Sequence, residues 1–95
     1  MRFIEEFLLK VIKIAEMKAI ARPLVLYYQH EKREESGITG FVIIADSHIS
    51  IHTYPFKGSL YMDIFSCKWF DKGRIIRYTN EVIEPSEVVE KFIRR

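Results

Sequence analysis

A short segment in the middle of the sequence is unusually dense in reactive side chains. Ser47, His48, Ser50 and His52 occur close together, and Cys67 follows one predicted strand later. Serine and cysteine can act as nucleophiles, and histidine can transfer protons near neutral pH. These residue types therefore predict nucleophilic or proton-transfer chemistry, provided that the fold brings them together.

Three interpretations stay open on the residues alone. His48 and His52 could ligate a metal. However, they are four positions apart, which on a strand is about 13 Å, too far to share one ion unless the strand bends. Cys67 and His52 could form a nucleophile and base on adjacent strands. The third and favoured alternative is a solvated polar strand face, with Cys67 buried as a small hydrophobic side chain. We expect no metal site.

Two strands joined by a turn are predicted to position these residues. Strict alternation over residues 48–54 predicts a strand with one polar and one apolar face. The polar face carries His48, Ser50, His52 and Tyr54, and the other carries Ile49, Ile51 and Thr53. Pro55 and Gly58 predict a turn into a second strand over 60–67. One face of this second strand carries Tyr61, Asp63, Phe65 and Cys67.

The flanking elements complete one predicted domain over residues 1–95. Apolar residues at three- and four-residue steps predict a helix over 3–19, followed by strands over 24–29 and 41–45 with a charged loop over 30–37 between them. Residues 74–83 are expected to be extended, and a helix capped by Ser86 is expected over 87–95. The fold class is α+β, a small antiparallel sheet with helices packed on one face.

Composition excludes several classes of protein. The 95 residues are 48% hydrophobic and 29% charged, as in a globular domain, and the net charge of +2 has both signs interspersed, which argues against nucleic-acid binding. A single cysteine excludes an intrachain disulfide. No apolar run approaches the roughly 20 residues that span a bilayer and no signal peptide is apparent, so we expect a cytoplasmic protein without membrane contact. So small a core favours a homodimer.

The order of the residues carries further information. Residues 37–67 (GITGFVIIADSHISIHTYPFKGSLYMDIFSC) resemble, without a gap, the core motif of the prokaryotic pyruvoyl-dependent S-adenosylmethionine decarboxylases. The shared positions are residues 47–53 (SHISIHT) followed by Pro55, Gly58, Asp63, Phe65 and Cys67.

The resemblance implies a self-cleaving proenzyme. Ser47 would attack the preceding carbonyl, and elimination from the resulting ester would split the chain between Asp46 and Ser47, leaving a pyruvoyl group as the cofactor. That group would form a Schiff base with S-adenosylmethionine and accept electrons during decarboxylation, supplying spermidine and polyamine biosynthesis. His52 corresponds to a residue that assists processing, Cys67 to the catalytic proton donor, and Thr39 to a serine that assists processing. The family's enzymes are homodimers.

Several positions differ from the family pattern. Asp46 replaces glutamate and Tyr54 replaces tryptophan, both mild changes, whereas Phe56 replaces a glutamate of the site and Lys68 replaces a glycine. The charged residues 31–35 replace a segment that carries an aromatic side chain, and the family's opening and closing strands have no counterpart, which implies a truncated and divergent member. Two alternatives therefore stay open: a non-catalytic homologue that binds or regulates a partner, and a pyruvoyl decarboxylase of another amino acid such as arginine.

The expected register makes the site testable. Pairing through the turn predicts partners whose numbers sum to about 115–119, with His52 close to residues 63–67. We expect Ser47, His52 and Cys67 to converge within about 10 Å, the span of a small-molecule site.

Overall fold

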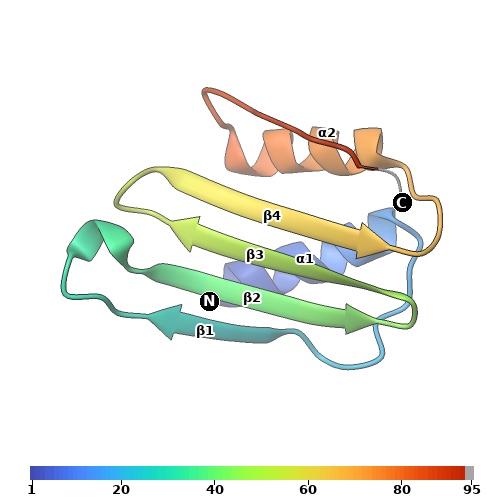
Figure 1. Ribbon diagram of the computed structural model, residues 1–95, viewed down its shortest axis with the longest axis horizontal. Helices are drawn as coiled ribbons and strands as arrows, with labels where there is room; N and C mark the ends of the chain where they lie inside the picture. The colour runs from blue at the N-terminus through green and yellow to red at the C-terminus, as the bar shows by residue number, and fades with distance from the viewer. Residues whose placement is uncertain (94–95) are drawn as a thin grey trace.

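A four-stranded antiparallel sheet with the strand order β1-β2-β3-β4 forms one layer of the structure, and helices form the other (Figure 1). The computed structural model describes residues 1–93. Its elements in chain order are α1 (Arg2–Ile14), β1 (Leu24–Tyr28), the 3-10 turn η1 (Arg33–Glu35), β2 (Gly37–Ile44), β3 (Ser47–Tyr54), β4 (Ser59–Ser66) and α2 (Lys72–Ile83). The predicted α+β class is confirmed.

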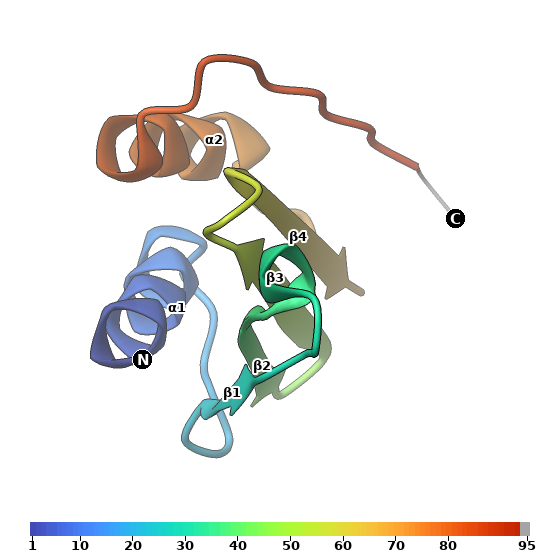
Figure 2. The ribbon, with the colours of Figure 1, turned by 90° about the vertical axis from the view of Figure 1, so that its left-hand side faces the viewer.

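Helix α1 covers one face of the sheet, and the opposite face is open. Figure 2 shows α1 and α2 on the same side of the sheet, with α2 beside α1 near the β4 edge. The amphipathic pattern of α1 explains its position, because its apolar side packs on the apolar face of β2 and β3. The most deeply buried side chains of this core are Phe7, Leu8, Val11, Val42, Ile49, Ile51 and Ile75.

A glycine lets the helix approach the sheet closely. A Cβ atom added to Gly40 would lie 2.9 Å from Leu8 Cδ1 and 3.0 Å from Ile51 Cγ2, closer than carbon atoms pack. The absence of a side chain at this point of β2 is therefore what allows α1 to lie across β2 and β3.

The first predicted helix ends earlier than expected. It stops at Ile14 instead of residue 19, and Glu16 adopts a left-handed backbone with φ 57°. The chain then turns back to the sheet, where Ala19 pairs with Ile44. Backbone pairing with the sheet thus overrides the helical pattern in this segment. The strand predicted over 41–45 is also longer and begins at residue 37.

The prediction for the C-terminal part was wrong. Residues 74–83 are not extended but belong to α2, whose N-cap is Asp71, not Ser86; the Asp71 side chain accepts a hydrogen bond from the Arg74 backbone N–H at 3.2 Å. Residues 87–93 of the predicted second helix are not helical, and residues 94–95 lie outside the described residues. The left-handed Glu84 (φ 53°) and the following Pro85 end α2 and prevent its continuation.

The predicted faces are confirmed, but the predicted register is wrong. His48 and His52 lie on the open face, whereas Ile49 and Ile51 are fully buried beneath α1. Strand pairing runs from Ser47 opposite Ser66 to Tyr54 opposite Ser59, so paired numbers sum to 113. The turn is shorter than expected and uses residues 55–58, with Gly58 in a left-handed conformation at φ 70°. Within residues 1–93, no helix is long and apolar enough to span a membrane.

Candidate active site

Ser47 opens β3 directly after the turn that connects it to β2. Its side chain is on the helix-covered side of the sheet, and the residue is only 7% exposed. Ser47 Oγ lies 3.0 Å from Asp46 Oδ1 and 3.0 Å from Ser66 Oγ on β4. The single hydroxyl proton can serve only one acceptor at a time, and the ionised carboxylate is the stronger one. The candidate nucleophile is therefore held in a defined position next to a carboxylate.

The peptide bond preceding Ser47 is also held. Its carbonyl oxygen, that of Asp46, accepts a hydrogen bond from the Cys67 backbone N–H at 3.3 Å. A donor at this position polarises the carbonyl and stabilises negative charge that develops on its oxygen during nucleophilic attack. The predicted cleavage site and the region of Cys67 thus meet at one end of the sheet.

The Asp46 side chain bridges two partners. Lys68 Nζ lies 3.2 Å from Asp46 Oδ2, while the other carboxylate oxygen faces Ser47. Hydrogen bonds from Lys68, and then from Ser47, lower the pKa of the Asp46 carboxyl below its usual value. Asp46 is therefore ionised at neutral pH and can act only as an acceptor.

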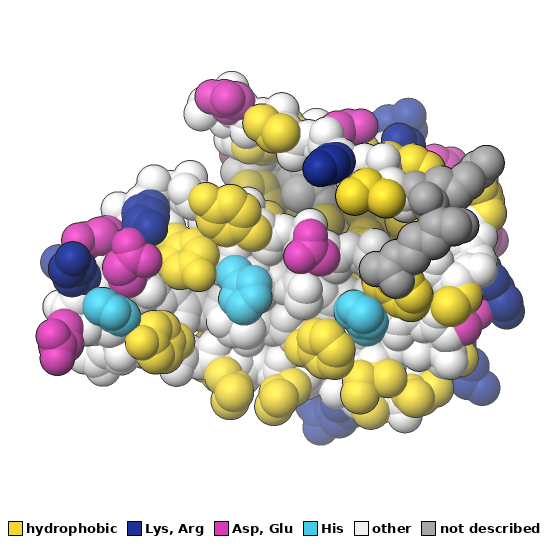
Figure 3. All heavy atoms as spheres, viewed as in Figure 1, with side chains coloured by type: hydrophobic (Ala, Val, Ile, Leu, Met, Phe, Trp, Pro, Cys, Tyr) yellow, Lys and Arg dark blue, Asp and Glu magenta, His cyan; other side chains and the backbone are white. Residues whose placement is uncertain are grey.

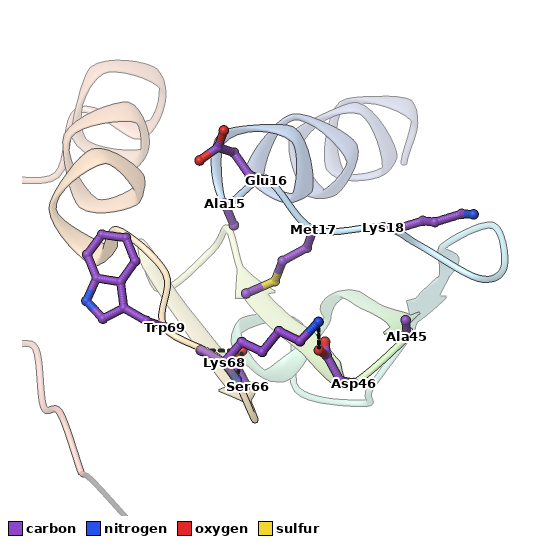
Figure 4. A pocket seen from close by; sticks show the side chains of 9 residues that line it. All are labelled: Ala15, Glu16, Met17, Lys18, Ala45, Asp46, Ser66, Lys68 and Trp69. Atoms are coloured by element: carbon purple, nitrogen blue, oxygen red, sulfur yellow. Dashed lines mark hydrogen bonds and ion pairs between the residues drawn. The ribbon is translucent and has the colours of Figure 1, made fainter.

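A small cavity lies next to these residues. Its volume is about 190 Å³. Figure 4 shows Lys68 reaching across it to Asp46, with Met17 and the end of α1 on the other side. The lining residues are Ala15, Glu16, Met17, Lys18, Ala45, Asp46, Ser66, Lys68 and Trp69. Cavities that enclose drug-sized ligands measure about 300–1,000 Å³, so this cavity is too small to enclose a nucleoside.

His52 does not join this cluster. It lies on the open face near the other end of β3, where its Nδ1 is 3.0 Å from Thr39 Oγ1 on β2. His52 lies five positions after Ser47 on β3, about 16 Å away at roughly 3.3 Å per position, and an odd number of positions reverses the face. The expected convergence of Ser47, His52 and Cys67 within about 10 Å is therefore wrong for a single chain.

The other predicted candidates are placed as follows. Cys67 lies just beyond β4 and is exposed, so the alternative of a buried small hydrophobic side chain is wrong. The His48 ring is stacked between Phe41 and Phe65, with centroid distances of 5.5 and 5.3 Å. Among residues 1–93 the structure contains no group of three or more histidine, cysteine, aspartate or glutamate side chains arranged to hold a metal.

Two of the altered positions meet near the His52 end. The Arg33 guanidinium lies 4.2 Å from the centre of the Phe56 ring, and Lys57 Nζ lies 2.7 Å from Glu35 Oε1. These contacts join η1 to the β3–β4 turn. Phe56, which replaces a glutamate of the family pattern, thus packs against Arg33 of the charged loop. The sequence alone did not reveal this contact.

The open face of the sheet is markedly apolar. Figure 3 shows hydrophobic side chains and histidines gathered on it. The exposed large apolar residues that alternation and strand pairing place there are Leu24, Leu26, Tyr28, Phe41, Ile43 and Tyr61. Contiguous exposed apolar patches often mark protein–protein interaction sites.

Comparison with known proteins gives the class to which this fold and site belong. The profile of the S-adenosylmethionine decarboxylase family matches residues 1–95. A Clostridium botulinum protein named S-adenosylmethionine decarboxylase proenzyme is 34% identical over 94 residues, which cover 98% of this chain and 76% of the relative. A Persephonella marina protein of the same name is 29% identical over 93 residues, covering 97% of this chain and 65% of the relative. The chain therefore belongs to the S-adenosylmethionine decarboxylase family.

Proposed function

We propose that the chain is a proenzyme that cleaves itself between Asp46 and Ser47 and then decarboxylates S-adenosylmethionine. The observation that carries the proposal is the arrangement around one peptide bond. Ser47 Oγ is buried beside a carboxylate, and the Asp46 carbonyl oxygen is held by the Cys67 backbone N–H. The nucleophile, an acceptor for its proton and a donor to the developing oxyanion all lie around the same bond.

The proposed cleavage is an internal rearrangement followed by elimination. Ser47 Oγ bonds to the Asp46 carbonyl carbon and loses its proton, the carbon–nitrogen bond breaks, and the nitrogen takes up a proton, which yields an ester. Loss of the Ser47 α-proton then breaks the bond between Ser47 Cβ and Oγ, so that residue 46 leaves with a main-chain carboxylate. Hydrolysis of the remaining enamine releases ammonia. The residues present fit this route, because Ser47 begins a strand whose pairing to Ser66 holds it after the chain is cut.

The pyruvoyl group left at Ser47 would supply an electron sink for decarboxylation. Cys67 is the residue that we assign to proton donation, since it is exposed and its backbone contacts the cleavage site. The product would be the aminopropyl donor for spermidine synthesis.

The separation of His52 from Ser47 supports a homodimer. A two-fold axis between two open sheet faces, running across the strands, would place the Thr39–His52 pair of one chain near the Ser47 end of the other. The apolar open face favours such stacking, because it would remove the exposed side chains from water.

Intact-mass spectrometry tests the proposal directly. We expect two fragments, residues 1–46 and a fragment of residues 47–95 that carries the pyruvoyl group. Ser47→Ala should stay intact with an unchanged circular dichroism spectrum, because it removes one hydroxyl and no core contact. Release of labelled carbon dioxide from carboxyl-labelled S-adenosylmethionine then measures the second activity. A wild-type chain that stays full-length after prolonged incubation would contradict the proposal.

One observation favours a second candidate, a pyruvoyl decarboxylase of another amino acid. The contact between Arg33 and Phe56 changes the charge and shape of the surface near His52, where the family pattern has a glutamate. A cleaved chain that releases carbon dioxide from arginine, and not from S-adenosylmethionine, would establish this alternative. A chain that never cleaves would instead support a non-catalytic regulatory subunit.

A further inference from the structure

Lys68 is a charged residue next to the cleavage site, and the proposed reaction assigns it no role. Its Nζ pairs with Asp46 Oδ2 at 3.2 Å, while Asp46 Oδ1 faces Ser47 Oγ at 3.0 Å. Resting on the proposed self-cleavage, we infer that Lys68 is a positioning residue that orients the Asp46 carboxylate to receive the Ser47 hydroxyl proton. Asp46 would then be the base of the first step as well as the residue at which the chain is cut.

The backbone around Lys68 is fixed by Ser66. Ser66 Oγ donates to the Lys68 carbonyl oxygen at 2.8 Å and accepts from the Lys68 backbone N–H at 3.1 Å. Because Ser66 gives its proton to that carbonyl, Ser47 Oγ meets two acceptors, the Ser66 oxygen and the Asp46 carboxylate. The same turn presents the Cys67 N–H to the scissile carbonyl. One short segment therefore positions both the proposed base and the proposed oxyanion donor.

The proton balance closes within the chain. As Ser47 Oγ bonds to the Asp46 carbonyl carbon, its proton passes to the Asp46 carboxylate. When the carbon–nitrogen bond breaks, the carboxylic acid returns that proton to the Ser47 nitrogen, so the carboxylate is regenerated. No other reactant is required for this step.

The electrostatic surroundings define the size of the expected effect. Lys68 is 81% exposed at its side chain, and Glu16 and Lys18 line the far side of the same cavity with opposite charges. Exposed ion pairs act weakly and are screened by salt, so a loss of about three- to five-fold in rate is expected when the pair is removed. At 1 M salt, where the screening length is about 3 Å, the wild-type advantage should largely disappear.

The experiment follows self-cleavage by mass spectrometry after cell-free synthesis, at 0.05 and 1 M sodium chloride. The variants are Lys68→Met and Lys68→Arg, with Arg22→Met as the matched control, because Arg22 forms a comparably exposed pair with Glu5 at 3.2 Å. We expect Lys68→Met to be three- to five-fold slower at low salt and insensitive to salt. Lys68→Arg should restore most of the rate, and Arg22→Met should behave as wild type.

A second readout tests the base itself. Because Lys68 lowers the pKa of the Asp46 carboxyl, the wild-type cleavage rate should fall only at pH values below the ordinary pKa of an aspartate. Asp46→Asn should be slower still than Lys68→Met at neutral pH. A wild-type chain that cleaves as fast as Lys68→Met at both salt concentrations would overturn the role of Lys68 alone. A wild-type chain that does not cleave would overturn the proposed function and this role together.

Discussion

Thr39 and His52 form a hydrogen-bonded pair across β2 and β3, with 3.0 Å between Oγ1 and Nδ1. The hydroxyl can fix the orientation of the ring and leaves Nε2 free to exchange a proton with a group on the open face. Thr39 stands where the family pattern has a serine, and the structure shows that the retained hydroxyl still reaches the histidine. The hydrogen bond between the two side chains is therefore retained despite this substitution.

Removing the Thr39 hydroxyl tests the importance of that hydrogen bond. Thr39→Val keeps the shape of the side chain but removes the hydroxyl, so self-cleavage should slow roughly ten-fold, part of the about 10²- to 10⁴-fold that a positioned acid–base group contributes. Thr39→Ser should cleave at nearly the wild-type rate. Thr79→Val, which removes a hydroxyl within α2, is the control. Equal rates for Thr39→Val and wild type would argue against a role for the pair.

Helix α2 is the part of the fold for which the sequence pattern predicted the wrong secondary structure. Five of its twelve residues are β-branched, a composition that suits an extended segment, although Ile75 and Tyr78 recur at helical spacing. In the structure Ile75 is 2% exposed, and the Tyr78 ring stacks on Phe7 of α1 at 5.5 Å. Burial of its ring raises the pKa of the Tyr78 hydroxyl above its usual value. Packing against α1 therefore stabilises a helix that local preference alone would not.

Two neighbouring isoleucines test this packing with the same chemical change. Ile75→Ala should lower the free energy of unfolding by about 2–5 kcal/mol, because it leaves a cavity between α2 and the core. Ile76→Ala should cost only about 1 kcal/mol, since Ile76 is half-buried. Urea denaturation in the Ser47→Ala background, which keeps the chain whole, measures both values. Similar losses for the two variants would be inconsistent with the observed face of α2.

The two halves of the predicted site lie at opposite ends of one sheet. Ser47 and Cys67 are near one end, and Thr39 and His52 are near the other. The face that carries His52 is also the face with the exposed apolar side chains. Dimerisation through that face would bury the apolar surface and complete the site in the same event.

Mixing two inactive variants tests this assembly. Ser47→Ala cannot cleave but keeps His52, whereas His52→Ala keeps the nucleophile and should cleave very slowly alone. In a mixture, the partner's histidine should act on the intact Ser47, so the mass of the His52→Ala chain should shift to that of its fragments.

An apolar-face variant supplies the control for the mixing experiment. Leu26→Glu on the open face, introduced into both chains, should abolish the rescue and give a monomer by light scattering. Leu9→Glu changes a similarly exposed leucine on α1 and should leave rescue and dimer intact. Wild-type protein that is monomeric at micromolar concentration, or mixtures without cleavage, would rule out a shared site.

Features that depend only on neighbouring residues could be predicted correctly from the sequence. Strict alternation over residues 48–54 placed His48 and His52 on the open face and Ile49 and Ile51 in the core, because side chains on a strand must point to opposite faces in turn. The contiguous motif through residues 37–67 led to the correct family. Both are local properties that need no knowledge of how distant segments meet.

Contacts between residues on different strands depend on how the strands pair, which local sequence patterns do not specify. The tight turn at residues 55–58 set the register of β4 and so brought Ser66, Cys67 and Lys68 to the Asp46–Ser47 bond. The sequence showed only that Lys68 replaces a glycine of the family pattern. Its ion pair with Asp46 could not be predicted, because contacts between residues distant in the sequence leave no periodic pattern. It likewise grouped His52 with Ser47, although five residues of extended strand keep them about 16 Å apart in one chain.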